Sequence, residues 1–521
     1  MADTPDAAAT LAAAYATEGA AIDLGRAVHE GALLDAAIRV PLATMNRHGL
    51  VAGATGTGKT KTLQLLAEQL STAGVPVLVA DVKGDVSGLA HPAEPGGAGE
   101  KRMAELGLPF TPTAFPVEFL SLGGLGPGVP VRATVSDFGP QLLAKVLEAN
   151  ETQESSLGLV FHYADTKGLP LLDLSDLRAL LTFLDSDAGK PELEGIGGLS
   201  SATVGVLLRS LVGLETGGGT EFFGEPQFDV ADLLRAAPDG RGVISCVELA
   251  AVQEKPALWS TALMWLVAEL FEALPEAGDL PQPKLVVFLD EAHLLFDDAT
   301  EAFLEALART VRLIRSKGVG VFFVTQQPTD LSEEVLAQLG LRIQHALRAF
   351  TPADAKKLRA TVSTYPVSDL YDVETLLTSV GIGEAAVTLL SEKGVPTPVV
   401  HTRMVAPASR MDPADDVDGA AKASPLWAEY GTRTDAQSAR EILAGRLAPP
   451  AQPKLETKEP DLQAPMEHVP APRKPKPEPR RAPAPGGSGA DAIGDFLRSR
   501  QGKELQKKVA RGIFGMLKKR L

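Results

Sequence analysis

The feature that most constrains this chain is a glycine-rich stretch of eight residues that follows a short apolar run. It has the form G-x-x-x-x-G-K-[ST], and its members are Gly53, Ala54, Thr55, Gly56, Thr57, Gly58, Lys59 and Thr60. Glycines let backbone N–H groups turn inward around an anion. The lysine reaches the β- and γ-phosphates, and the Thr60 hydroxyl is suited to bind Mg²⁺. This phosphate-binding loop therefore predicts a site for ATP with Mg²⁺.

The residues on either side of the loop supply the strand and the helix that such a loop requires. Residues 50–52 end a short apolar strand, and leucines after the loop recur at helical spacing until Gly74. A second apolar run, VPVLVADVKGD, follows at once. Because the order strand, loop, helix, strand is typical of parallel sheets, we predict an α/β fold with a mostly parallel sheet flanked by helices.

The composition excludes several classes of protein. With 521 residues, 45% of them hydrophobic and 22% charged, the chain can bury a core and hold two or more domains. Its one cysteine, Cys246, lies in an apolar run and is expected in the core, so no disulfide framework is possible within one chain. The first residues carry acids rather than the basic start of a signal peptide, and we find no bilayer-spanning apolar stretch. We expect a soluble, cytoplasmic protein.

Charge is distributed unevenly along the chain. The net charge is −16, but residues 451–521 hold 16 basic and 8 acidic side chains, a net of +8, which leaves −24 for the residues before them. An acidic body argues against a surface coated for nonspecific binding of nucleic acid. Contact with nucleic acid would need a local basic lining, such as the channel of a ring.

Changes in composition and periodicity divide the chain into predicted parts. Four runs with apolar residues three and four apart indicate an α-helical insertion between early and late strands, although helices belonging to the same core would have the same periodicity. The parts are an N-terminal lead-in (1–45), the first part of the ATPase core (46–135), the helical insertion (136–216), the second part of the core (217–405), a C-terminal extension (406–446), a disordered Pro-rich linker (447–489) and a basic amphipathic helix (490–521).

A second motif completes the predicted site. The apolar run 285–289 reads as a buried strand that ends on Asp290 and Glu291, and ligands bind at the carboxyl ends of parallel strands. Asp290 is suited to hold the Mg²⁺ shell with Thr60, and Glu291 to orient or deprotonate the attacking water. The pair therefore favours hydrolysis over binding alone. Residues 290–293 also spell the DEAH box of a helicase superfamily whose other motifs are not visible, so His293 reads as a helix-entry residue with a coupling role as the alternative.

The next apolar run ends on Gln326, which we predict to sense the γ-phosphate; a polar strand end that faces solvent is the alternative. The helix before this run carries arginines away from its apolar stripe. Exposed arginines are usually only solvated, but in ring ATPases an arginine from a neighbouring subunit completes the site. The candidates for that role are Arg309, Arg312, Arg315, Arg342 and Arg348.

Taken together, these motifs resemble the HerA–FtsK superfamily of P-loop motor ATPases, and most of all the bacterial stand-alone HerA-like (YjgR-like) proteins. The stretches that carry the resemblance are NRHGLVAGATGTGKT, VADVKGDVSGLA, GGTEFFGEPQFDVADLLR, VVFLDEAHLLFDDA, VRLIRSKGVGVFFVTQQP and LRIQHALRAFTPAD. The resemblance implies a RecA-like core with a helical insertion, a homo-oligomeric and commonly hexameric ring, and ATP hydrolysis coupled to translocation on, or unwinding of, double-stranded DNA.

The same resemblance assigns the trans-acting arginine to Arg315 and identifies two departures from the family pattern. Leu341 stands where a polar residue is expected, which puts a contact near the γ-phosphate in doubt. The lead-in is too short for the β-barrel domain with which HerA motors dock a nuclease, so we do not expect a nuclease partner.

The C-terminal segment leaves the partner open. Its predicted helix has one apolar and one basic face, which suits contact with DNA, an anionic membrane or another subunit, or a fold back onto its own body. Two alternatives to a DNA motor follow: an ATP-dependent assembly or regulatory protein, and a secretion-type motor that acts on a protein or membrane complex.

Overall fold

The computed structural model describes residues 4–278, 280–296, 301–391 and 393–447. The predicted amphipathic helix (490–521) and all but the first residue of the predicted linker (447–489) lie outside the described residues. Residues 1–450 group into one compact unit, so the predicted division of this part of the chain stays a prediction.

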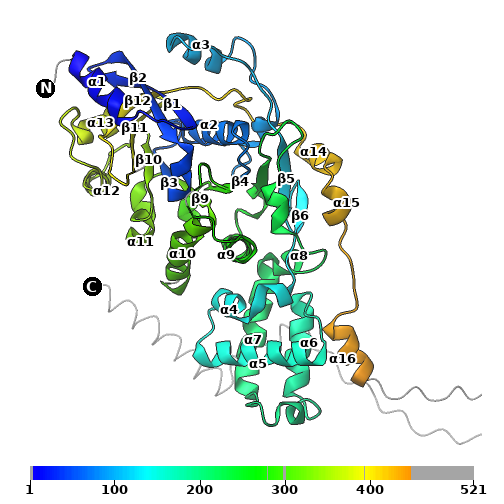
Figure 1. Ribbon diagram of the computed structural model, residues 1–521. Helices are drawn as coiled ribbons and strands as arrows, with labels where there is room; N and C mark the ends of the chain where they lie inside the picture. The colour runs from blue at the N-terminus through cyan, green and yellow to red at the C-terminus, as the bar shows by residue number, and fades with distance from the viewer. Residues whose placement is uncertain (1–3, 279, 297–300, 392, 448–521) are drawn as a thin grey trace, which may run out of the picture. The chain divides into compact units, whose positions relative to one another are not determined.

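One large sheet organises the described part of the chain (Figure 1). Its 12 strands lie in the order β2-β1-β12-β11-β10-β3-β9-β8-β4-β7-β5-β6. Neighbours from β10 to β6 run parallel, whereas β2, β1, β12 and β11 form an antiparallel end. The strands are β1 (Ala21–His29), β2 (Ala32–Pro41), β3 (Gly49–Ala52), β4 (Val77–Asp81), β5 (Val117–Leu122), β6 (Val129–Val131), β7 (Ile244–Glu248), β8 (Leu285–Leu289), β9 (Val319–Thr325), β10 (Leu341–Gln344), β11 (Glu384–Leu389) and β12 (Val400–Met404).

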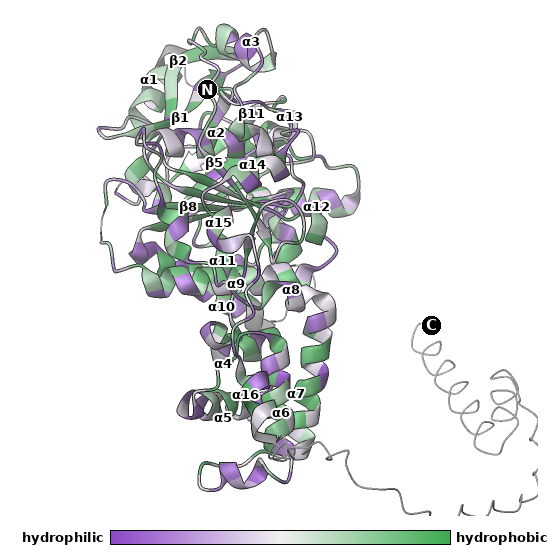
Figure 2. Ribbon diagram, turned by 90° about the vertical axis from the view of Figure 1, so that its right-hand side faces the viewer, coloured by the Kyte–Doolittle hydropathy of each residue, from purple (hydrophilic) through white to green (hydrophobic). Residues whose placement is uncertain are grey.

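The central strands are apolar because helices cover both faces of the sheet. Every residue of β3, β4, β7, β8 and β9 is buried, as expected for parallel strands packed on two sides. Helix α2 (Lys59–Thr72) lies on one face, and α9 (Pro256–Ala273) and α10 (Glu301–Ile314) lie on the other (Figures 1 and 2). Figure 2 colours the strands between these layers as strongly hydrophobic. The predicted RecA-like α/β fold with a mostly parallel sheet is confirmed.

Smaller helices surround this core, and residues expected in it are buried. Cys246 is fully buried on β7, and Trp265 on α9 is 1% exposed and donates from Nε1 to Asp137 Oδ2 at 3.0 Å. This tryptophan therefore packs in the core. The other helices near the sheet are α3 (Ala98–Glu105), α11 (Glu333–Leu336), α12 (Pro352–Val362) and α13 (Val373–Ser379).

The residues before the phosphate-binding loop belong to the sheet. Helix α1 (Thr4–Ala14) precedes the hairpin of β1 and β2, and β1 pairs with β12, for example Arg26 with Arg403. The two strands of this hairpin are nine and ten residues long, and β12 pairs with β1, which in turn pairs with β2.

The predicted helical insertion is a cluster of helices beside the core (Figure 1). The predicted range 136–216 spans α4 (Val135–Val146, which begins one residue earlier), α5 (Glu151–Lys167), α6 (Leu174–Asp185) and α7 (Ser201–Leu214), and the short α8 (Thr220–Phe222) follows it. Capping boxes begin two of these helices, at Asn150 with Gln153 and at Asp173 with Asp176, so the local sequence fixes where they start.

A C-terminal strap, defined as residues 406–447, connects the phosphate-binding helix with this helical cluster. It begins on α2, where the Glu68 carboxylate accepts from the backbone N–H groups of Ala408 and Ser409 at 2.7 and 2.9 Å. It ends on α6, where Ser438 donates to Asp176. The helices of the strap are α14 (Val417–Ala423), α15 (Trp427–Tyr430) and α16 (Ala439–Leu447).

Candidate active site

The phosphate-binding loop connects the carboxyl end of β3 to α2, and neighbouring strands fix its backbone. The Gly53 N–H donates to the Thr325 carbonyl at 3.3 Å, and the Ala54 N–H donates to the Ala346 carbonyl at 2.8 Å. Gly53 and Gly58 have φ angles of 155° and 119°, which side-chain-bearing residues rarely adopt. A Cβ on Gly53 would also lie 2.5 Å from the His345 Cβ. The glycines at these positions are therefore required by geometry.

The two charged or polar residues that end the loop face its interior and its acidic neighbours. Lys59 is 8% exposed, and its Nζ donates to the Gly53 carbonyl at 2.8 Å, which holds the ammonium over the loop. Burial lowers the pKa of Lys59 below its ordinary value. The Thr60 hydroxyl lies 3.4 Å from Asp85 Oδ2. The loop thus presents a cation for phosphates and a hydroxyl beside a carboxylate.

A cluster of carboxylates lies at the same edge of the sheet. Asp81 ends β4, Asp85 follows it, and Asp290 follows β8, which pairs with β4. One oxygen of each lies within 4.8 Å of the others. Asp290 is 2% exposed, and burial, followed by the charges of Glu291 and the other acids, raises its pKa to about 7. Such a concentration of negative charge favours a cation at this position.

The donor set fits Mg²⁺. Asp290 Oδ2 and Asp85 Oδ1 are buried and have no hydrogen-bond partner among the described residues. Both oxygens of Asp81 accept from backbone N–H groups of the next residues, which shapes the loop that carries Asp85. Carboxylate and hydroxyl oxygens are the ligands that Mg²⁺ prefers. Thr60, Asp85 and Asp290 are therefore the residues suited to hold it.

Glu248 adds a fourth carboxylate on the neighbouring strand. It ends β7 opposite Asp81, is 4% exposed, and its Oε1 has no partner within the described part of the chain. Burial, followed by the charges of Asp81 and Asp85, raises the pKa of Glu248 to about 8. This carboxyl group is thus protonated at neutral pH, unlike an ordinary surface glutamate.

Glu291 has an unusual backbone and a charged partner. Its φ is 45°, in the left-handed region that side-chain-bearing residues avoid at a cost of about 1–3 kcal/mol. The side chain is 5% exposed and forms an ion pair with Lys83 through Oε1. Oε2 lies 3.2 Å from His293 Nδ1 without hydrogen-bond geometry. Backbone strain of this kind is typical of catalytic positions.

The other two predicted catalytic residues, Gln326 and Arg315, lie at opposite edges of the sheet. Gln326 follows β9, which pairs with both β3 and β8, so this exposed side chain is at the edge of the phosphate-binding loop. Arg315 begins the 3₁₀ turn that precedes β9, so it lies at the amino edge. Within one chain, therefore, the fold brings Gln326 to the site and keeps Arg315 away from it.

Leu341 and Arg342, two other residues considered from the sequence, both lie on β10. Leu341 begins β10 opposite Gly49, so within one chain it is not beside the phosphate-binding loop. Arg342 donates to the carbonyls of Thr364 and Leu336, at 2.8 and 3.3 Å, and serves the local structure.

Sequence reasoning missed His345, Asp81, Asp85 and Lys83. Fully buried His345 donates from Nδ1 to the Glu384 carbonyl at 2.8 Å, so its Nε2 accepts from the Thr62 hydroxyl at 2.9 Å. Burial lowers its pKa to about 4, which keeps it neutral. The available signal for the other three was the DVKGD sequence at the carboxyl end of the second predicted strand.

A mostly parallel sheet with this loop and these acids at its carboxyl edge defines the class of P-loop nucleotide-binding proteins. The sequence profile described as helicase HerA-like C-terminal matches residues 29–520. The chain belongs to this family. No curated protein matches it significantly.

Solved structures share the fold at low sequence identity. The bacterial conjugative coupling protein TrwBΔN70 in its unbound monoclinic form has a TM-score of 0.51 and 15% identity over 77% of this chain and 93% of its own. Its trigonal form with sulphate has a TM-score of 0.52 and 16% identity over 78% and 93%. TrwB in complex with ADP and Mg²⁺ has a TM-score of 0.50 and 16% identity over 76% and 91%. These likenesses show that the fold is shared.

The described helices do not include a membrane span, because none combines the necessary length with sufficient apolar character.

Proposed function

We propose that this protein hydrolyses ATP with Mg²⁺ and uses the reaction to translocate on, or unwind, double-stranded DNA as a homo-oligomeric ring, with a hexamer favoured. The observation that carries the hydrolytic part is the arrangement of Glu291 beside Asp290 at the edge of the phosphate-binding loop. A protein that only binds nucleotide has no need of a strained, buried glutamate at this position.

Each residue at the carboxyl edge has a role in this proposal. Backbone N–H groups of residues 53–60 and the Lys59 ammonium hold the phosphates. Thr60 and Asp290 hold Mg²⁺, and Asp85 joins them; the bound ion would neutralise the charge that develops on the phosphates. Glu291 orients the attacking water and accepts its proton. Gln326 contacts the γ-phosphate and responds to its loss.

The ring follows from the position of Arg315. This exposed guanidinium lies at the amino edge, where it cannot reach the phosphate-binding loop of its own chain. A second copy that presents its amino edge to the carboxyl edge of the first would supply the missing positive charge. Head-to-tail contacts close into a ring where the rotation between successive copies closes, and we propose such a rotation here.

DNA is the substrate that the family description favours. The acidic body, with a net charge of −24 before residue 451, restricts contact to a lined channel or to the basic C-terminal segment. The residues before the phosphate-binding loop form a helix and a hairpin of the sheet, so the described part of the chain does not support a nuclease-docking barrel. We also propose that residues 136–216, which hold α4 to α7, form a helical insertion of the ATPase core.

The test is steady-state ATP hydrolysis with and without linear double-stranded DNA, at low and moderate salt, beside Glu291→Gln. Stimulation by DNA that Glu291→Gln abolishes supports the DNA motor. Turnover that needs Glu291 but is indifferent to DNA keeps the ATPase and rejects the DNA motor. Stimulation by anionic vesicles that is lost on deletion of residues 491–521 would instead identify a membrane-linked motor.

A further inference from the structure

Lys83 is a second lysine in the active site, and no role in hydrolysis has yet been given to it. It lies in the loop after β4, and its Nζ forms the ion pair with Glu291 Oε1. Its side chain is 43% exposed, whereas that of Glu291 is 5% exposed. Glu291 follows Asp290, one oxygen of which lies within 4.8 Å of a carboxylate oxygen of Asp85, and Asp85 Oδ2 lies 3.4 Å from the Thr60 hydroxyl. Lys83 therefore lies at the same edge of the sheet as the phosphate-binding loop.

The backbone beneath Lys83 is held by hydrogen bonds to Asp81, whereas the Lys83 side chain is half-exposed. Asp81 Oδ1 accepts from the N–H groups of Lys83 and Gly84 at 3.1 and 2.8 Å, and its Oδ2 accepts from that of Val86 at 2.8 Å. The same loop carries Asp85, which lies beside the Thr60 hydroxyl. One fixed loop thus presents a Mg²⁺ ligand and, two residues earlier, a long flexible cation.

The ion pair opposes the action of Glu291 on water at one of its two oxygens. The Lys83 ammonium donates to Oε1 and competes with the attacking water for that oxygen. The other oxygen, Oε2, lies 3.2 Å from His293 Nδ1 and has no hydrogen-bond partner among the described residues. Withdrawal of Lys83 would therefore open Oε1 to the attacking water.

A γ-phosphate provides the competing partner. It carries more negative charge than one carboxylate, and lysine is a common phosphate ligand because its ammonium is a compact charge with three donors. Burial lowers the pKa of Lys83, but its hydrogen bond with Glu291 and the charge of Glu291 raise it by more, so the net pKa lies above its ordinary value. The side chain thus stays cationic and suited to either partner.

We infer that Lys83 is a γ-phosphate ligand that pairs with Glu291 until a triphosphate binds, and then exchanges partners and leaves Glu291 free to act on water. This inference rests on the proposed ATPase function. ADP has no γ-phosphate to draw Lys83 away, so the exchange links release of the base to the presence of a hydrolysable nucleotide. Lys83 is then a positioning residue for Glu291 and a discriminator between ATP and ADP.

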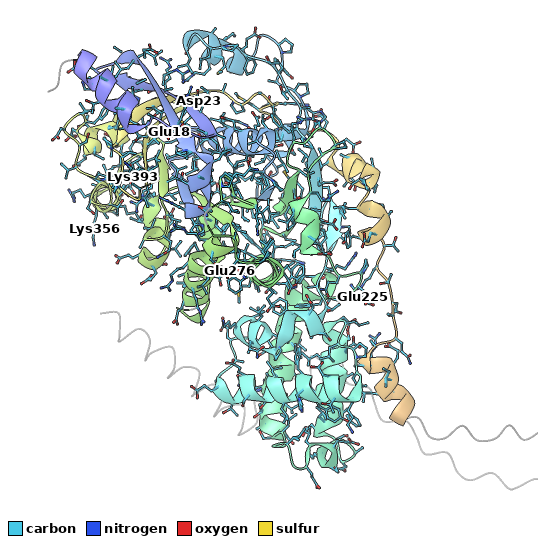
Figure 3. The ribbon with its side chains drawn as sticks, viewed as in Figure 1. Glu18, Asp23, Glu225, Glu276, Lys356 and Lys393 are labelled. Atoms are coloured by element: carbon cyan, nitrogen blue, oxygen red, sulfur yellow. The ribbon has the colours of Figure 1, made fainter. Side chains whose placement is uncertain are left out.

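The test compares the affinities of fluorescent ADP and of fluorescent ATPγS, each with Mg²⁺, for the full chain. Lys83→Ala is expected to weaken ATPγS about tenfold and to change ADP less than twofold, because one charge-assisted hydrogen bond to the γ-phosphate is lost. Lys83→Arg keeps the charge and should retain at least part of the ATPγS affinity. The matched control is Lys356→Ala, an exposed lysine on α12 (Figure 3).

The second part of this binding test uses the Glu291→Gln variant. Removing the charge that competes for Lys83 should tighten ATPγS binding, and Lys83→Ala in the Glu291→Gln background should cancel that gain. Equal losses for ADP and ATPγS in Lys83→Ala, or unchanged affinity for both, would overturn the inference while leaving the ATPase proposal standing. If Lys59→Ala binds both nucleotides like the unmodified protein, the proposed function itself fails.

Discussion

The carboxyl edge of the central sheet carries most of the predicted catalytic residues, whereas the amino edge carries Arg315. The carboxyl edge gathers Lys59, Thr60, Asp290 and Glu291, all from one chain, and most of their side chains are buried. The amino edge presents Arg315, an exposed guanidinium without an ion-pair partner among the described residues. The carboxyl edge has an excess of acidic groups and buried carboxylate oxygens without a hydrogen-bond partner among the described residues. The amino edge has a cation without an ion-pair partner among them.

A buried histidine lies at the amino edge, where Arg315 is exposed. His48 lies there, 2% exposed, and its Nδ1 accepts from the Val321 N–H at 3.0 Å. Burial lowers the pKa of His48 to about 4, and the charge of Arg315 adds to that shift. A neutral histidine thus serves the sheet while Arg315 remains available at the surface. The contrast teaches that Glu291 and Arg315 lie at opposite ends of the parallel strands, so the proposal that they act in one site requires two chains.

The largest effect is expected when Lys59, the cation of the carboxyl edge, is substituted. Lys59→Ala should abolish measurable nucleotide binding, a loss of at least about 100-fold, because two phosphates lose their buried counter-charge. Equilibrium titration with fluorescent ATPγS measures it, with Lys356→Ala as the control. Affinity within a few-fold of the unmodified protein would show that the carboxyl edge is not the nucleotide site.

Glu291→Gln should separate binding from chemistry at the same edge. We expect ADP affinity to be retained, ATPγS affinity to rise, and turnover to fall by about 10²–10⁴-fold, because an amide cannot accept the proton of the attacking water. Single-turnover hydrolysis and ATPγS titration on the same preparation provide both readouts. Normal turnover in this variant would remove Glu291 from the role of base.

Arg315→Ala tests whether the edges complete each other between subunits. Turnover should fall by about 10²-fold, because a donor to the transition-state charge is lost. Mixing this variant with Glu291→Gln protein should restore activity above that of either alone, since some interfaces then pair an intact Glu291 with an intact Arg315. Absence of any recovery in confirmed mixed oligomers would argue that Arg315 does not act across the interface.

Asp85→Asn should have the smallest effect. We expect the Mg²⁺ concentration for half-maximal hydrolysis to rise about tenfold with maximal turnover largely kept, because one carboxylate ligand becomes a neutral amide. A Mg²⁺ titration at saturating ATP measures this shift. Asp415→Asn, at a side chain that is 86% exposed, is the control, and equal shifts in the two variants would exclude Asp85 from the Mg²⁺ shell.

The elements that could be predicted are those whose chemical motif and structural signal are contiguous in the sequence. Residues 285–289 were predicted as a buried strand and form β8 with those bounds, and the loop of residues 53–60 follows β3 as its pattern required. In both cases the chemistry and the structural signal lie next to each other in sequence. The roles assigned to Glu291, Gln326 and Arg315 stay predictions.

Strand order explains what could not be predicted. Asp81 and Asp85 lie beside Asp290 only because β4 pairs with β8, although more than 200 residues separate them in the sequence. Lys83 meets Glu291 for the same reason. Periodicity identifies strands but not their neighbours, so a DVKGD sequence could not be joined to a DEAH sequence without the sheet.

The pairing of β1 with β12 has a consequence for how the chain acquires its structure. Residues 21–29 are synthesised early, but their partner on the sheet side is residues 400–404, and Tyr15 lies within hydrogen-bond distance of the carbonyls of Val387 and Pro398. Contacts over such separations close slowly. Until more than 370 further residues have left the ribosome, the first hairpin has an unpaired, largely apolar edge of the kind that promotes aggregation. The earliest strands made are thus among the last able to dock.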